Sequence, residues 1–245
     1  MARLSGKTAI ITGGTSGIGL ATAQLFIEEG ARVVITGQNE TRLQEAAEML
    51  GSSAIPVRAN VLELANLDYL ADQVEATVGS IDILFANSGI AKDASFRDVT
   101  EAAFDEEIAI NLKGVFFTVQ KLEPLMKDGG SIILNTTTLA QTAKVGEIVY
   151  SASKAAVRSL ARSFSLELLD RKIRVNAVAP GAIETPIWTK MAIDEATAQE
   201  VLARTPVGRF GQPREIATAV LFLASDDSSF MLGEEILVDG GWATL

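Results

Sequence analysis

The fold is decided by the stretch TAIITGGTSGIG, residues 8–19, in which a short apolar segment runs into a glycine-rich turn. Residues 8–12 show little polar alternation, which predicts a strand buried on both faces. The glycines permit a tight turn and a close backbone approach, and the helix that follows offers free N–H groups to a pyrophosphate. Such a pattern also occurs in ordinary turns, but this one lies between a strand and a helix. The sequence therefore predicts a phosphate-binding loop formed by Gly13, Thr15, Ser16, Gly17, Ile18 and Gly19.

Short apolar segments alternate with longer amphipathic segments along the rest of the chain. We expect strands at residues 8–12, 32–36, 54–57, 81–86, 131–135, 174–179 and 236–238. We expect helices at residues 17–29, 40–50, 66–78, 100–127, 150–170 and 213–224, with Gly30 and Gly51 at helix C-caps. Repeated β-α-β units predict an α/β fold in which right-handed crossovers build a doubly wound parallel sheet.

The alternation of strands and helices is interrupted at about residues 184–212, where a helical stretch near residues 193–204 lies between Pro186 and Pro213. Ligands of such sheets bind beyond the carboxyl ends of the strands. We therefore expect one domain over residues 1–245, with this insert covering the site as a lid.

The composition excludes several kinds of chemistry. The chain has no cysteine and no histidine, so thiolate and imidazole metal sites and catalytic triads are excluded, and we expect no metal. A formal net charge of −10 argues against nucleic acid and acidic membranes as partners. We expect a cytoplasmic protein, because no signal peptide or long apolar run is evident.

The end of the second expected strand, Thr36-Gly37-Gln38, should meet the adenosine ribose of a dinucleotide. An acidic residue there would favour NAD, and a basic one NADP. Gly37 and Gln38 are uncharged and Arg42 follows one helical turn later, which favours NADP(H) over NAD(H). Alternatively, Arg42 is an exposed helix charge.

Tyr150 and Lys154 lie four residues apart where a helix begins, so both side chains share one face. A neighbouring ammonium lowers a phenol pKa towards the range where proton transfer is efficient. Such a pair is also common on ordinary helices. Its place just after the fifth strand favours catalysis, with Tyr150 as the proton donor or acceptor.

Two further positions carry candidate polar groups. A hydroxyl among Thr136, Thr137 and Thr138, which follow the fifth strand, could bond a carbonyl oxygen as charge develops there. Threonine is also simply a good strand residue. Asn111 lies inside an expected helix, where asparagine is a mediocre choice, which suggests a buried hydrogen-bonding role.

These residues resemble the short-chain dehydrogenase/reductase family over essentially the whole chain. The matching motifs occur in the family's order: Thr12-Gly13-xxx-Gly17-x-Gly19, Asn87-Ser88-Gly89, Asn111, Tyr150-xxx-Lys154, Pro180-Gly181-Ala182-Ile183-Glu184-Thr185-Pro186 and Val238-Asp239-Gly240-Gly241. The resemblance implies a single Rossmann-type domain with a seven-stranded parallel sheet flanked by helices, assembled as a homotetramer.

The resemblance also implies roles for individual residues. Tyr150 would be the catalytic acid/base, Lys154 would lower its pKa and hold the nicotinamide ribose, and Asn111 would sustain a water-linked proton path to Lys154. The remaining cofactor contacts would come from Asn60, Val61, Asn87, Ser88, Gly89, Pro180, Gly181, Ile183 and Thr185.

The chain departs from the family pattern at three of these positions. The catalytic serine is replaced by threonine, either Thr137, thirteen residues before Tyr150, or the alternate Thr138. Asn60 stands where an aspartate usually contacts adenine, and Ser88 replaces the middle alanine of Asn-Ala-Gly. None of these changes removes a hydrogen-bonding group that the chemistry needs.

The expected function is therefore that of an NAD(P)(H)-dependent ketoreductase or secondary-alcohol dehydrogenase. The expected pocket is mostly apolar and favours an apolar ketone or alcohol; it comprises Ala140, Gln141, Val145, Val149, Pro186, Ile187, Trp188 and Met191. Two alternatives remain: a 3-oxoacyl-thioester reductase of fatty-acid type, and a non-catalytic NAD(P)-binding sensor.

Overall fold

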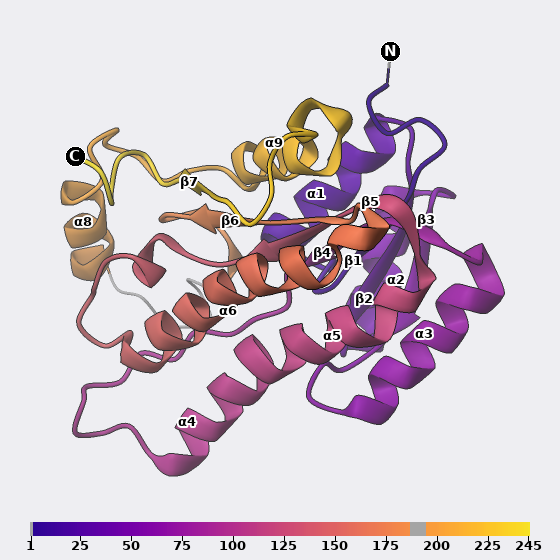
Figure 1. The fold of residues 1–245 in the computed structure, drawn as a ribbon. Coiled ribbons are helices and arrows are strands. Elements are labelled where there is room, and N and C mark those ends of the chain that lie inside the picture. Colours follow the sequence, from indigo (N-terminus) through magenta and orange to yellow (C-terminus); the bar gives the residue numbers. More distant parts are fainter. Residues whose placement is uncertain (1, 187–194) are drawn as a thin grey trace.

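The computed structural model describes residues 2–186 and 195–245 and is built around a seven-stranded parallel sheet (Figure 1). The strand order is β3-β2-β1-β4-β5-β6-β7, so the direction of winding reverses between β1 and β4. The strands are β1 Thr8–Ile11, β2 Arg32–Gly37, β3 Ala54–Arg58, β4 Ile81–Ala86, β5 Met126–Asn135, β6 Arg174–Pro180 and β7 Glu235–Val238. The predicted doubly wound α/β fold is confirmed.

Helices cover both faces of the sheet (Figure 1). One face carries α1, α2 and α9, and the other carries α3, α5 and α6. Their bounds, with those of α4 and α8, are α1 Gly17–Glu28, α2 Glu40–Leu50, α3 Leu64–Val78, α4 Glu101–Ile108, α5 Gly114–Leu122, α6 Ile148–Glu167, α8 Glu195–Ala203 and α9 Pro213–Ala224.

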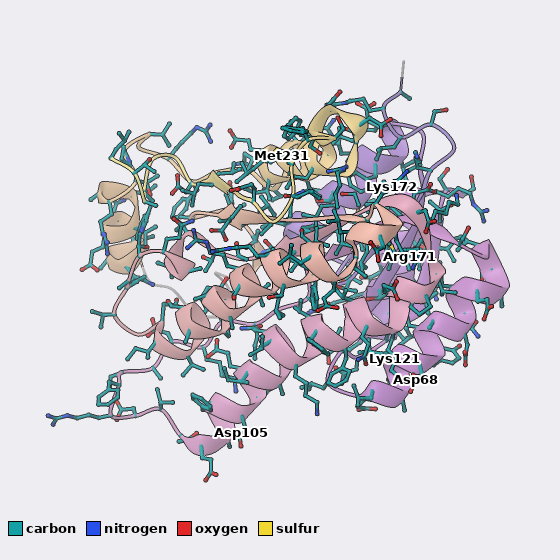
Figure 2. All side chains as sticks on the ribbon, in the orientation of Figure 1. Asp68, Asp105, Lys121, Arg171, Lys172 and Met231 are labelled. Carbon is teal, nitrogen blue, oxygen red and sulfur yellow. The ribbon has the colours of Figure 1, made fainter. Side chains whose placement is uncertain are left out.

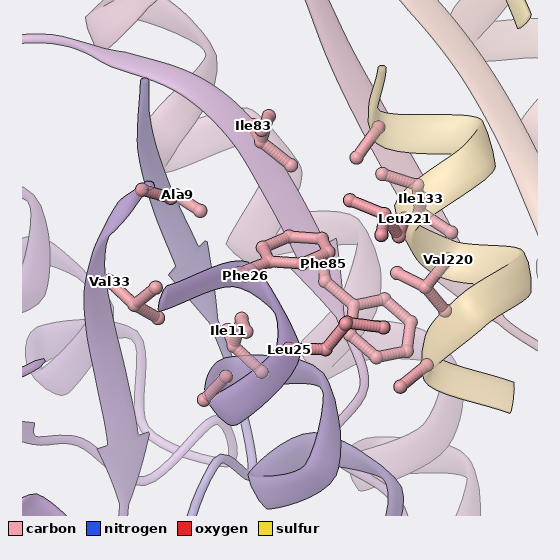
Figure 3. Close-up of a cluster of buried hydrophobic side chains, with 14 of the residues drawn as sticks. Ala9, Ile11, Leu25, Phe26, Val33, Ile83, Phe85, Ile133, Val220 and Leu221 are labelled. Atoms are coloured by element: carbon pink, nitrogen blue, oxygen red, sulfur yellow. The ribbon is translucent and has the colours of Figure 1, made fainter. Parts of the chain in front are cut away.

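The strands are apolar on both faces because each face is covered. Ile11 of β1 packs with the layer of α1 and α9, whereas its neighbour Ile10 packs with the opposite layer. Figure 3 shows the hydrophobic cluster between the sheet and the layer of α1 and α9, in which the fully buried Phe26 and Phe85 lie with Leu221 of α9. Burying each aromatic side chain contributes on the order of 2 kcal/mol.

The prediction of one continuous helix over residues 100–127 is wrong. It is divided into α4, a π-helical turn at Ala109–Lys113 and α5, and a short 3-10 turn at Glu123–Leu125 ends it. Strand β5 then begins at Met126, five residues earlier than predicted. The reason is local: Pro124 lies in the 3-10 turn, and Arg171 bonds the Glu123 carbonyl at 2.9 Å and the Asp128 carboxylate at 3.0 Å.

Ion pairs join neighbouring helices on the outer surface. Lys121 of α5 lies 2.5 Å from Asp68 of α3 (Figure 2). Arg214 of α9 likewise pairs with Glu28 of α1 at 2.5 Å. Both pairs are largely exposed, so we assign them only a small part of the stability.

The insert is described in part. Residues 187–194 lie outside the described structure; beyond them α8 follows, and Ile183 forms an isolated parallel bridge with Gly211. The lid role of residues 184–212 and the single-domain division remain predictions. Within residues 2–186 and 195–245, no helix combines the length and the apolar character needed to cross a membrane.

Candidate active site

A cavity of about 800 Å³ lies over the carboxyl ends of the central strands, where doubly wound sheets bind ligands. It extends from the glycine loop after β1 to the first turns of α6. Seventeen of the predicted site residues for the cofactor line it, namely Gly13, Thr15, Ser16, Gly17, Ile18, Gln38, Asn60, Val61, Asn87, Ser88, Gly89, Tyr150, Lys154, Pro180, Gly181, Ile183 and Thr185. Gly19, Arg42 and Asn111 are not among the lining residues.

The glycine loop has the backbone geometry that its sequence predicts. Gly13 and Gly17 have φ angles of +64° and +53°, which side chains rarely tolerate. A Cβ on Gly19 would lie 2.2 Å from the Gly13 carbonyl oxygen, so this residue shapes the loop without lining the cavity. No side chain caps the N-terminus of α1 at Ser16, which leaves its first N–H groups available to an anion.

Polar contacts tie this loop to the end of β4. The Thr12 hydroxyl accepts from the backbone N–H groups of Asn87 and Ser88 at 3.0 and 3.1 Å. The Asn87 amide donates to the carbonyls of Thr12 and Gly13 at 2.9 and 3.2 Å. The tight loop and the uncapped N–H groups of α1 together suit the pyrophosphate of a dinucleotide.

The far end of the cavity, at β2 and β3, contains no carboxylate among its described lining residues. Gln38 lines it, and its carbonyl accepts a hydrogen bond of 3.1 Å from Arg58 Nε. Asn39 caps α2 by accepting from the Arg42 backbone N–H at 2.9 Å, and Arg42 is not among the lining residues. Arg58, which ends β3 and which sequence reasoning did not single out, is not among them either.

Tyr150 and Lys154 lie in the first turns of α6 on the cavity wall. Lys154 is buried, and its Nζ donates to the Asn135 carbonyl at 2.7 Å, which fixes the ammonium at the end of β5. Nζ lies 6.0 Å from the centre of the Tyr150 ring. The pair is therefore brought together on one face of the helix, as its spacing predicts.

The structure separates the two candidate threonines. Thr137 lines the cavity with Tyr150 and lowers the pKa of the Tyr150 phenol, and its own hydroxyl donates to the Pro180 carbonyl at 3.5 Å. The Thr138 hydroxyl instead donates to the Asp239 carboxylate at 2.9 Å. Thr137 is thus the threonine that acts on the Tyr150 phenol, and its catalytic role, preferred from its spacing, stays a prediction.

Burial dominates the titration of the catalytic pair. It raises the pKa of the Tyr150 phenol well above the ordinary value; the Thr137 hydrogen bond opposes this rise, while Glu147 and Glu107 add to it. Lys154 does not offset these effects, so the predicted lowering of the Tyr150 pKa is not seen in the protein alone. Burial also lowers the pKa of Lys154 to about 8, with Glu107 opposing that change.

Asn111 lies fully buried in the π-helical turn behind Lys154. Its Oδ1 accepts from the Ile90 N–H at 2.9 Å, and its Nδ2 donates to the Ile90 carbonyl at 2.8 Å and the Ser153 hydroxyl at 3.2 Å. The asparagine thus has the buried hydrogen bonds expected of it. Single-turn π segments of this kind occur frequently at functional sites.

The substrate end of the cavity differs from the predicted apolar pocket. Of the eight expected residues, Pro186 lines it, and Ile187, Trp188 and Met191 lie outside the described residues. Val145 is 91% exposed and Gln141 binds Glu235, because the loop before α6 turns them away. Ala140 and Val149 do not line it either. Side chains that sequence reasoning missed take this wall instead, among them Lys92, Asp93, Lys144, Glu147, Leu139 and Trp242.

Within the described ranges, no group of acidic side chains could hold a metal ion. The fold and the cavity together define a dinucleotide-binding domain with a buried tyrosine, lysine and threonine at one end. That combination is typical of oxidoreductases that handle a proton beside a nicotinamide.

Comparisons with known proteins also indicate an oxidoreductase. A family model described as enoyl-(acyl carrier protein) reductase matches residues 13–243. The chain is 44% identical to oxidoreductase asL5 of Sarocladium schorii over 99% of this chain and 98% of that protein. It is 41% identical to the 3-oxoacyl-[acyl-carrier-protein] reductase FabG of Thermotoga maritima, covering 98% of both. It is 38% identical to an NADP-dependent (R)-specific alcohol dehydrogenase of Lentilactobacillus kefiri, again covering 98% of both.

A solved short-chain type dehydrogenase/reductase from Mycobacterium marinum superposes with a TM-score of 0.93 at 34% identity, covering 99% of this chain and 97% of that one. The chain belongs to the short-chain dehydrogenase/reductase family. It is an oxidoreductase of this NAD(P)-using family.

Proposed function

We propose that the protein is a ketoreductase or secondary-alcohol dehydrogenase in which Tyr150 transfers the proton. In the reductive direction the Tyr150 phenol donates its proton to the carbonyl oxygen, and the Thr137 hydroxyl stabilises the charge that develops there. The nicotinamide, when bound, supplies or accepts the hydride. The observation that carries this proposal is that Tyr150, Thr137 and Lys154 line the same cavity as the glycine loop.

Lys154 and Asn111 support this chemistry by binding the cofactor and by relaying protons. The Lys154 ammonium is fixed by the Asn135 carbonyl, in position to bind the nicotinamide ribose. Asn111 anchors the loop at Ile90 and, as in the family, would sustain a water-linked proton path to Lys154. The glycine loop and the open N-terminus of α1 would hold the pyrophosphate.

We favour NADP(H) as the cofactor. The absence of a carboxylate among the described lining residues beside Gln38 supports this preference, and so does Arg58, whose guanidinium is held at the Gln38 carbonyl. Arg42 remains a further candidate; neither Arg58 nor Arg42 is among the lining residues. The relative from Lentilactobacillus kefiri is named as NADP-dependent.

Reduction of a 3-oxoacyl thioester is the second candidate, favoured by the name of the Thermotoga maritima relative. A carrier protein would need basic side chains at the entrance of the site, but Lys127, near the start of β5, pairs with Asp82 at 2.9 Å. A small carbonyl or alcohol substrate therefore remains the first choice. A homotetramer in the cytoplasm stays a proposal that rests on the resemblance to the family.

The proposal is tested by titrating NADPH and NADH and then measuring turnover on a panel of ketones, hydroxyketones and a carrier-protein thioester. We expect oxidation of NADPH with at least one small ketone or hydroxyketone, and tighter binding of NADPH than of NADH. Turnover confined to the thioester would select the second candidate. Tight cofactor binding without turnover on any of these, or on alcohols in reverse, would instead support a non-catalytic sensor.

A further inference from the structure

Glu147 is a buried acid on the wall of the active-site cavity. It directly precedes α6 and lies three residues before Tyr150. Its side chain is only 6% exposed, yet the residue lines the cavity. One carboxylate oxygen, Oε1, lies 3.6 Å from Lys144 Nζ. The other, Oε2, is buried and has no hydrogen-bond partner in the part of the chain that the structure describes.

An unpaired oxygen in such a place is costly. Leaving a buried acceptor unsatisfied costs about 1–3 kcal/mol, and more when the group is charged. Burial raises the pKa of the Glu147 carboxyl, and the acidic Asp93 adds to this rise, while Lys144 opposes it. The fold therefore holds an unused hydrogen-bond acceptor buried in the side chain of a residue that lines the cavity.

The surrounding loop keeps this acceptor in place. Ala94 N–H donates to the Gly146 carbonyl at 3.0 Å, and a Cβ on Gly146 would lie 2.0 Å from Asp93 Oδ1. Gly146 has a φ angle of +88°, a conformation that glycine adopts without strain. Two loops are thus packed closely beside Glu147, and within the described residues neither supplies a hydrogen bond to Oε2, so a ligand in the cavity can supply one.

We propose that Glu147 Oε2 accepts a hydrogen bond from a second hydroxyl group of the substrate, so that the preferred substrates are hydroxyketones and the corresponding diols. This inference rests on the proposed function, in which Tyr150 serves the reacting carbonyl. A plain apolar ketone leaves Oε2 unsatisfied, and a site built to bond a hydroxyl discriminates strongly against analogues that lack it. Glu147 is then a specificity-determining residue.

The test compares hydroxyketones with analogues that cannot donate: hydroxyacetone with methoxyacetone, acetoin with its methyl ether, and diacetone alcohol with its methyl ether. The ether keeps the electronic effect of the oxygen on the carbonyl and removes only the donor. We expect kcat/KM to be at least about tenfold higher for the hydroxyl member of at least one pair, a difference of about 1.4 kcal/mol. Ratios within about twofold in every pair would overturn the proposal.

Variants assign the preference to the residue. In Glu147→Leu the ratio should fall towards one, whereas Glu147→Gln, whose amide oxygen still accepts, should retain part of it. Glu167→Gln, an exposed position on the same helix, is the matched control and should keep the wild-type ratio. A wild-type ratio in Glu147→Leu would overturn the proposal; should that variant not fold, the same result in a folded Glu147→Ala would do so. Reduction of all ketones without preference defeats this inference alone, and no reduction of any ketone defeats the proposed function as well.

Discussion

Two adjacent threonines show how position decides chemistry at the scale of single residues. Thr137 and Thr138 have the same side chain at the end of β5, but one meets Tyr150 and the other binds Asp239 near the C-terminus. The 3-10 turn that begins after Thr137 causes the difference, because it rotates successive side chains in different directions. Only one of the two hydroxyls can then serve a substrate oxygen.

This separation predicts different effects of the same substitution. Thr137→Val should lower kcat/KM by about 10²- to 10³-fold, because a hydrogen bond to the developing charge is lost. Thr138→Val should keep kcat/KM within several-fold and lower the free energy of unfolding by about 1 kcal/mol. Steady-state kinetics and denaturant unfolding measure both. If kcat/KM falls more in Thr138→Val than in Thr137→Val, then Thr138 and not Thr137 is the catalytic threonine.

Glu107 makes the stability of the protein depend on pH. Burial raises its pKa to about 7 from an ordinary 4.5, and the Lys92 N–H that donates to it at 3.1 Å only partly opposes this. The folded protein therefore holds the proton more tightly than the unfolded chain. The resulting contribution to stability is present at low pH and is lost as the pH rises through about 7.

Glu107→Gln isolates this effect, since the amide can still accept from Lys92 but cannot ionise. The unfolding free energy of the variant minus that of wild type should rise by about 1–3 kcal/mol between about pH 5 and about pH 8. Urea unfolding at several pH values measures this difference, in which the other titrating groups cancel. A difference that stays constant with pH, or falls, would show that Glu107 ionises normally.

At the scale of elements, the predictable features follow from hydrophobic periodicity and glycine chemistry. Both give β1, the loop and α1 correctly, because covered parallel strands are continuously apolar and the loop needs unusual backbone angles. The π-helical turn at Ala109–Lys113 was not predictable, because one extra residue in a turn hardly alters the apolar pattern. The early start of β5 was missed because Asp128, Gly129 and Gly130 are poor strand residues that tertiary contacts hold in the sheet.

The tight turn between β1 and α1 gives an element-scale prediction. Gly19→Ala forces a methyl group to within 2.2 Å of the Gly13 carbonyl oxygen, so the loop must move. We expect cofactor affinity to fall by at least about tenfold and stability by 2 kcal/mol or more, roughly the cost of overpacking. Gly51→Ala is the comparison: nothing lies within 4 Å of its Cβ position and Gly51 does not line the cavity, so the variant should lose about 1–3 kcal/mol from backbone strain at φ +79° and keep its cofactor affinity. Equal cofactor affinity in the two variants would contradict the role of the loop.

At the scale of the whole molecule, the sheet order explains why the site residues meet. The order β3-β2-β1-β4-β5-β6-β7 brings the loops after β1, β4 and β5 to one edge, so segments far apart in sequence line one cavity. The residues that the sequence motifs single out for the cofactor line one end of that cavity, because backbone geometry restricts them, and their binding of a cofactor stays a prediction. The substrate end was predicted poorly: Lys144 and Glu147 lie in an irregular loop, where neither periodicity nor capping indicates which side chains turn inwards.

The central claim is that Tyr150 transfers the proton to a carbonyl oxygen in an NAD(P)-bound site. The most direct test is pre-steady-state oxidation of the reduced cofactor by the best ketone, measured for wild type and for Tyr150→Phe, with the cofactor Kd of each. The account predicts that Tyr150→Phe keeps its cofactor Kd within about tenfold while the rate falls by about 10³-fold or more, within the range of general acid catalysis. A wild-type rate in Tyr150→Phe would contradict it and require a different proton donor.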